Sequence, residues 1–149
     1  MRIELRPAVP QDFEYCRRIY CSEMREMLEK LHLDPTAHAR GFTYIWNEVC
    51  VRIIVVDGID LGWIQTSVDD HGDMFIAQLF VEAQWQGRGI GTAVMQRLIS
   101  EATRDGQSIW GYALKTNPAV QLYKRLGFRV VREGKDKFCM LRECTPSTS

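Results

Sequence analysis

Residues 86–91, Gln86-Gly87-Arg88-Gly89-Ile90-Gly91, join an apolar run to an amphipathic segment. The run before them, residues 74–81 (MFIAQLFV), is rich in aromatic and branched residues and predicts a strand. After them, apolar residues recur every fourth position from Ile90 to Ala102 and predict a helix that begins near Gly89. Glycines let the main chain approach a ligand closely, and the first N–H groups of a helix attract negative charge. The stretch therefore predicts a binding site for a phosphate or a diphosphate.

Glycines at a turn between a strand and a helix also occur for geometric reasons alone, and the glycines by themselves favour neither interpretation. Their spacing is not G-x-G-x-x-G, and no Lys-Ser/Thr follows as it does in a P-loop. The stretch does fit Gln/Arg-x-x-Gly-x-Gly/Ala, with Gln86, Gly89 and Gly91 at the defined positions. This pattern resembles the acyl-CoA signature of the GNAT superfamily, the coenzyme-A-dependent N-acetyltransferases.

A second stretch, residues 117–128 (NPAVQLYKRLGF), is similar to the Asn…Leu-Tyr-x-x-Leu-Gly-Phe segment of the same superfamily. Many relatives have one more residue between the Asn and the Tyr. The residues themselves predict a helix that starts at Asn117-Pro118 and ends in a left-handed cap at Gly127, with Phe128 as the apolar contact beyond it. With two motifs in the family's order, the chain is identified as a member of the GNAT superfamily.

The rest of the chain agrees with the element order of this family. Apolar periodicity and turn signals predict a strand, two helices, three strands, a helix, a strand, a helix and two strands. In order, these elements cover residues 3–7, 10–31, 34–46, 50–56, 59–68, 74–81, 89–102, 108–114, 117–126, 128–132 and 137–141. Asp57-Gly58 predicts a tight hairpin turn, and Gly41 is expected to weaken the second helix. The resemblance implies the α/β (α+β) GNAT fold, in which four helices flank one mixed, mostly antiparallel sheet of about seven strands, splayed at its centre.

Length and composition limit the other possibilities. The 149 residues suggest a single domain over residues 1–144 with a frayed tail at 145–149. Lys+Arg and Asp+Glu both number 19, and this zero net charge argues against nucleic acid or an anionic membrane as a partner. The apolar runs are too short for a membrane span, and the N-terminus lacks a signal-peptide core. Five cysteines without a C-x-x-C pair predict reduced thiols in a cytoplasmic protein, and no metal site.

The resemblance also implies a role for each part of the two motifs, with acetyl-CoA as the cosubstrate. Main-chain N–H groups of residues 86–91 would hold the coenzyme diphosphate, and Arg88 would add positive charge. The end of the preceding strand would hydrogen-bond the pantetheine arm, while Val81 N–H would polarise the thioester carbonyl. The implied cofactor-binding residues are Leu79, Phe80, Val81, Gln86, Gly87, Arg88, Gly89, Ile90, Gly91, Thr92, Asn117 and Tyr123.

Tyr123 is implied as the catalytic residue, the acid that protonates the departing thiolate. A phenol can donate to a thiolate of similar basicity at little cost. On the sequence alone, its position on the apolar stripe of its helix favours a core residue instead. No general base is assigned, because Gln78 cannot titrate and Glu23, Glu48 and Glu82 fit surface positions as well as catalytic ones.

The resulting hypothesis is direct transfer of an acetyl group from acetyl-CoA to a primary amine, without a covalent enzyme intermediate. The compact chain shows no docking extension and so favours a small-molecule amine, with residues 10–47 shaping the acceptor side. Three alternatives stay open: a non-catalytic module that binds or senses acyl-CoA, acetylation of a protein or peptide amine, and a glycine loop that holds another phosphorylated ligand. Homodimers are common in the family, but the sequence gives no geometry for one.

Overall fold

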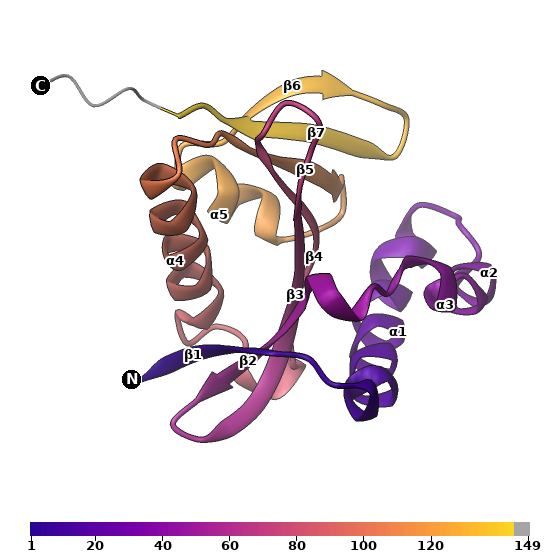
Figure 1. The fold of residues 1–149 in the computed structure, drawn as a ribbon. Helices are drawn as coiled ribbons and strands as arrows, with labels where there is room; N and C mark the ends of the chain where they lie inside the picture. The colour runs from indigo at the N-terminus through magenta and orange to yellow at the C-terminus, as the bar shows by residue number, and fades with distance from the viewer. Residues whose placement is uncertain (145–149) are drawn as a thin grey trace, which may run out of the picture. The chain divides into compact units, whose positions relative to one another are not determined.

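The computed structural model describes residues 1–144, so the tail expected at 145–149 lies outside the described residues. The strands are β1 (Ile3–Pro7), β2 (Val51–Val56), β3 (Ile59–Val68), β4 (Met74–Val81), β5 (Ile109–Leu114), β6 (Arg129–Glu133) and β7 (Lys137–Arg142). The helices are α1 (Phe13–Lys30), α2 (Pro35–Arg40), α3 (Phe42–Ile45), α4 (Ile90–Arg104) and α5 (Ala119–Arg125) (Figure 1). The predicted order of elements is confirmed, with the second predicted helix divided at Gly41 into α2 and α3.

The seven strands form one open sheet in the order β1-β2-β3-β4-β5-β7-β6. The pairs β1–β2, β2–β3, β5–β7 and β6–β7 are antiparallel, whereas β4 and β5 are parallel. A parallel pair needs a long crossover, and α4 supplies it here. The register between β4 and β5 joins residues 74–76 to residues 109–111. The mixed sheet flanked by helices is therefore confirmed, while its splaying further along these two strands stays a prediction.

The turn between β2 and β3 has the geometry that its sequence predicted. Asp57 has φ +50° and Gly58 has φ +83°, so both central residues are left-handed. Two left-handed residues define the two-residue hairpin turn that matches the twist of the flanking strands, and Asp-Gly is a favoured pair for it. This hairpin is thus set by local sequence.

The described chain divides into two compact units. Unit 1 consists of Met1–Gln65 and Gln78–Gly91, and unit 2 consists of Thr66–Ala77 and residues 92–144. Strands β3 and β4 each contribute residues to both units. The single domain expected over residues 1–144 stays a prediction.

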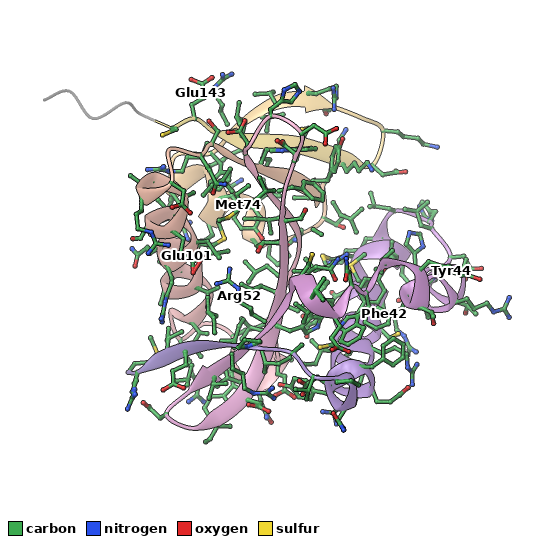
Figure 2. All side chains as sticks on the ribbon, viewed as in Figure 1. Phe42, Tyr44, Arg52, Met74, Glu101 and Glu143 are labelled. Atoms are coloured by element: carbon green, nitrogen blue, oxygen red, sulfur yellow. The ribbon has the colours of Figure 1, made fainter. Side chains whose placement is uncertain are left out.

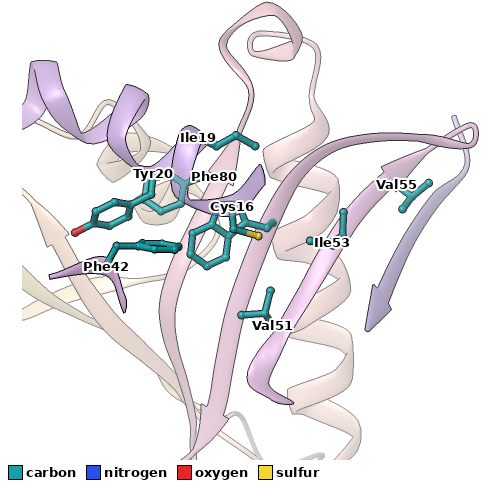
Figure 3. Close-up of a cluster of buried hydrophobic side chains, with 9 residues drawn as sticks. Cys16, Ile19, Tyr20, Phe42, Val51, Ile53, Val55 and Phe80 are labelled. Atoms are coloured by element: carbon teal, nitrogen blue, oxygen red, sulfur yellow. The ribbon is translucent and has the colours of Figure 1, made fainter. Parts of the chain in front are cut away.

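Unit 1 has a core of aromatic and branched side chains between α1 and its strands (Figure 3). Phe42 is fully buried there, with its ring centroid 5.1 Å from that of Tyr20 and 5.9 Å from that of Trp63. From the same short helix Tyr44 points outward and is 92% exposed (Figure 2). Burial of one such aromatic side chain stabilises the fold by roughly 1.5–3 kcal/mol. The buried members are Cys16, Ile19, Tyr20, Phe42, Val51, Ile53, Val55, Trp63 and Phe80.

The structure confirms in part the apolar face that residue spacing predicts for α1, which consists of Phe13, Cys16, Tyr20, Met24, Met27 and Leu31. Cys16 and Tyr20 are buried as expected, but Met27 and Leu31 are only half-buried. Ile19 and Leu28 are buried in their place. Helix α1 is therefore rotated slightly about its own axis, relative to the orientation that residue spacing alone predicts.

Unit 2 is built on α4, α5 and the strands from β5 to β7. The predicted stripe of α4 is buried at residues 94, 95, 98 and 102. Ile109 and Ala113 of β5, Val120 of α5 and Met140 of β7 are buried as well. No helix within residues 1–144 combines the length and the apolarity that a membrane span requires.

Candidate functional site

The loop that leads into α4 contains two left-handed glycines. The φ angle is +76° at Gly87 and +81° at Gly89. A Cβ in this region costs roughly 1–2 kcal/mol per residue, so glycine is needed for the conformation. Among the described residues, nothing lies within 4 Å of the position that a Cβ would take at either glycine. The loop therefore borders open space and leaves its main chain accessible to a ligand.

The sequence predicts that main-chain N–H groups of residues 86–91 bind an anion, and the structure removes one of them from this set. Gln86 N–H donates to the carbonyl of Ala83 at 3.2 Å and closes the 3-10 turn Ala83–Trp85. Gln86 therefore does not contribute a free N–H group, and the array begins at Gly87. It continues into the first turn of α4, Ile90 to Thr92, where N–H groups have no partner within the helix and the macrodipole attracts negative charge.

Arg88 lies in this loop with an exposed side chain. Its guanidinium carbon is 5.0 Å from the ring centroid of Trp85, within the distance of a cation–π contact. Trp85 is half-buried and so gives the flexible arginine a fixed neighbour. This contact keeps a positive charge beside the glycines.

The end of β4 lies next to β3 in unit 1. Phe80 is buried, with its ring 5.5 Å from that of Trp63, while Leu79 and Val81 are half-buried. A Cβ at Gly62 would lie 2.2 Å from the carbonyl oxygen of Phe80, so only glycine permits this approach of the two strands. The segment that the sequence assigned to the pantetheine arm is thus held by its neighbours.

The side chain of Gln86 connects three parts of unit 1. Its amide nitrogen Nε2 donates to the carbonyl oxygen of Val81 at 2.8 Å. The same nitrogen donates to Oε2 of Glu23, on α1, also at 2.8 Å. The start of the loop is therefore bonded both to the strand end and to the first helix.

Two of the three acids considered as bases, Glu23 and Glu82, have hydrogen-bond partners in unit 1. Glu82 accepts from the hydroxyl of Tyr15 at 3.1 Å and lies 3.9 Å from the guanidinium of Arg18. Burial and the neighbouring carboxylate of Glu82 raise the pKa of Tyr15 above its usual value. Glu23 and Glu82 border a cavity of about 350 Å³ between α1 and residues 82–84. Neither acid is singled out as a base by its surroundings.

In unit 2, the segment from Asn117 to Phe128 has capping contacts at both ends. Oδ1 of Asn117 accepts from Ala119 N–H at 2.9 Å, the start signal that the sequence predicted. At the other end Gly127 has φ +95°, and Phe128 N–H donates to the carbonyl of Tyr123 at 3.0 Å. Gly127 N–H donates to the carbonyl of Lys124 at 3.1 Å, which completes a Schellman cap.

Tyr123 is half-buried inside this capped segment. Its ring centroid is 5.9 Å from that of Phe128, the apolar contact that accompanies such a cap. The ring borders a small apolar cavity of about 30 Å³ together with Met95, Tyr112 and Met140. Burial raises the pKa of Tyr123 to about 12, so its hydroxyl keeps the proton throughout the neutral range.

The structure divides the predicted site residues between the two units. Unit 1 brings together Leu79, Phe80, Val81, Gln86, Gly87, Arg88, Gly89, Ile90 and Gly91, and unit 2 contains Thr92, Asn117 and Tyr123. The sequence did not reveal the bond from Glu23 to Gln86 or the contact of Trp85 with Arg88. No local spacing rule could have predicted the hydrogen bond between Gln86 and Glu23, since 63 positions separate the two residues in the sequence.

The five cysteines are all free thiols, and Cys16 and Cys139 are buried. Burial raises the pKa of the Cys16 thiol to about 12, which leaves it protonated and unreactive as a nucleophile. Among residues 1–144, no three His, Cys, Asp or Glu side chains come together as a metal-binding group.

In sequence, the chain matches one family model and one known relative. The family model described as "Acetyltransferase (GNAT) domain" matches residues 46–130, more than half of the chain. An uncharacterized N-acetyltransferase of Methanocaldococcus jannaschii is 35% identical over 72 residues, which cover 46% of this chain and 31% of that protein. The match thus spans about a third of the relative's own length.

Solved structures agree with this fold. The crystal structure of PaiA N-acetyltransferase from Thermoplasma acidophilum, in complex with coenzyme A, has a TM-score of 0.81 at 15% identity, over 96% of this chain and 99% of that chain. Naa50 of Arabidopsis thaliana, in complex with the bisubstrate analogue CoA-Ac-MVNAL, has a TM-score of 0.64 at 16% identity, over 96% of this chain and 99% of that chain. At these identities the likeness establishes a shared fold.

Proposed function

This chain belongs to the GNAT acetyltransferase family, and on that premise we propose that it transfers the acetyl group of acetyl-CoA directly to a primary amine. The coenzyme and the amine would bind together, and no covalent enzyme intermediate would form. The buried, protonated thiol of Cys16 argues against that residue as the nucleophile of a covalent intermediate.

The observation that carries the proposal is the accessible main chain of the glycine loop at the start of α4. Two left-handed glycines and the first turn of a helix offer N–H groups to a diphosphate. Gly87 to Thr92 would bind the coenzyme, with Arg88 adding positive charge. Val81 N–H would polarise the thioester carbonyl, and a donor aimed at a developing oxyanion is worth roughly 3 kcal/mol.

Tyr123 would protonate the departing thiolate of the coenzyme. With its pKa raised to about 12, the hydroxyl holds its proton at every neutral pH, as an ordinary tyrosine also does. The same shift makes the phenol a weaker acid, and the proton would move as the thioester bond breaks and the thiolate becomes basic. Asn117 would bind the coenzyme through its amide NH₂, while its Oδ1 accepts from Ala119 N–H.

A small-molecule amine is the first candidate for the acceptor, with residues 10–47 shaping its side of the site. The cavity beside α1, which Glu23 and Glu82 border, supports a compact polar acceptor. A protein or peptide amine is the second candidate, since a relative of the same fold holds a CoA–peptide bisubstrate analogue.

The test is a thiol-release assay with acetyl-CoA over a panel of polyamines, amino acids, aminoglycosides and N-terminal peptides. Release of free CoA that depends on a small amine is the expected result. Release with peptides alone would move the proposal to a protein acceptor. Calorimetric binding of CoA without release in any panel would instead indicate a sensing module, and stronger thermal stabilisation by ATP than by acetyl-CoA would indicate another phosphorylated ligand.

We also propose that the protein works in a reducing compartment, the cytoplasm. The five cysteines of residues 1–144 are free thiols, which supports this location because cytoplasmic proteins keep their cysteines reduced. The family's tendency to form homodimers stays a prediction, and light scattering of the purified protein would test it.

A further inference from the structure

Every N–H group of Gln86 is already bonded within unit 1. Its main-chain N–H donates to Ala83 at 3.2 Å. Its side-chain amide has two N–H bonds, and Nε2 makes one contact to Val81 O and one to Glu23 Oε2, each at 2.8 Å. Gln86 therefore has no donor left for a diphosphate, although it occupies the first position of the loop motif.

The bond to Val81 fixes the start of the loop. Residues 83–85 form a 3-10 turn after the strand, and the side-chain amide of Gln86 donates back to the carbonyl oxygen of Val81 at the strand end. This contact closes a ring of six residues, from 81 to 86. The position of Gly87, where the accessible N–H groups begin, is thereby defined relative to β4.

The bond to Glu23 connects the same point to α1. Tyr15 of α1 donates to Glu82, and Glu23 accepts from Gln86, so the helix holds this segment at two places. Tyr15 and Glu23 are eight residues apart, close to two helical turns, and so lie on one face of α1. A hydrogen bond to a carboxylate is also stronger than one between neutral groups.

We propose that Gln86 and Glu23 are positioning residues for the coenzyme: together they hold the glycine loop in its binding conformation without contacting the diphosphate. The inference rests on the proposed function. Because a loop that is already ordered loses less freedom on binding, the affinity for coenzyme depends on a residue of α1, on the acceptor side. The amine side and the coenzyme side of unit 1 are thereby coupled.

The experiment measures CoA affinity by calorimetry for Glu23→Ala, Gln86→Ala and the double variant. Each single change should raise the dissociation constant of CoA about fivefold to tenfold. The double variant should bind no more weakly than the weaker single variant, because both changes break the same link. Glu23→Gln keeps an acceptor oxygen and should restore much of the affinity.

Glu26→Ala is the matched control, since Glu26 lies on the same helix and pairs with Lys30. It should leave the dissociation constant unchanged. Hydrogen exchange at Gly87 and Gly89 in the free protein gives a second readout, and both amides should exchange faster in Glu23→Ala than in the control. Unchanged affinity and unchanged exchange in Glu23→Ala would overturn the positioning role, as would additive effects in the double variant. Wild-type protein that fails to bind CoA at all would instead overturn the proposed function, and with it this inference.

Discussion

The two motifs of this chain offer different groups to a ligand. They are the glycine loop at residues 86–91 and the capped segment at residues 117–128. The loop offers its main chain, and its glycines matter because they have no side chain. The capped segment offers one side chain, Tyr123, and its other residues hold the helix that bears it.

This difference predicts which substitutions should change ligand affinity and which should change the reaction rate. A change in the loop alters backbone geometry, and so it should alter ligand affinity. A change at Tyr123 removes one proton donor and leaves the backbone as it is, so it should alter the rate. Substitutions in the two segments should therefore separate loss of affinity from loss of rate.

The largest effect is expected from Tyr123→Phe. Loss of a general acid lowers turnover by roughly 10²-fold or more, while the phenyl ring keeps the contact with Phe128. Steady-state kinetics should show the loss in kcat, and calorimetry should show CoA affinity within about twofold of the wild type. Tyr112→Phe, at an exposed tyrosine of unit 2, is the control. Equal kcat in both variants would refute the acid role.

Gly89→Ala should act on affinity instead. With φ at +81°, a Cβ costs roughly 1–2 kcal/mol and moves the loop away from its binding conformation, so CoA binding should weaken by about tenfold. Gly58→Ala carries a similar strain, at φ +83°, in the β2–β3 turn. That control should lower the melting temperature without changing the CoA dissociation constant. The same loss of affinity in both variants would show that the glycine loop has no special role.

A smaller effect, on stability alone, is expected at the cap of α5. Gly127→Ala places a side chain at φ +95° and should destabilise the protein by about 1 kcal/mol, lowering Tm by roughly 2–4 °C. Gly127→Asn should lower Tm less, since asparagine tolerates the left-handed region better. Thermal unfolding tests both, and Gly134→Ala is a control without positive φ. Equal Tm for alanine and asparagine would argue against the cap.

The smallest effect concerns pH. The pKa of Tyr123, raised to about 12, lies above the value near 10 of a free tyrosine, so the hydroxyl stays protonated as pH rises through 10. The acid function is lost only as pH approaches 12. A profile of kcat from pH 7 to 10.5, with saturating amine, should show no fall that depends on Tyr123. A decline centred near pH 10 that disappears in Tyr123→Phe would contradict the raised pKa.

The sequence predicted the fold well because its signals are local. The Asp57-Gly58 turn, the break at Gly41 and the caps around α5 each depend on a few adjacent residues, and each is present. The predicted face of α1 was less accurate, because Ile19 and Leu28 are buried by partners distant in sequence. Periodicity finds a helix more reliably than it finds the rotation of that helix against a sheet.

In the candidate site too, the sequence predicted the features that depend on adjacent residues and missed those that depend on tertiary contacts. The sequence by itself determined the family and the cap that holds Tyr123, including the left-handed Gly127, since residue type and spacing fix φ preferences and helix ends. Only the tertiary structure decided that Gln86 N–H is occupied, that Glu23 bonds Gln86, and that burial raises the pKa of Tyr123. Such features depend on which groups folding brings within hydrogen-bond distance and shields from water, and no local pattern encodes that.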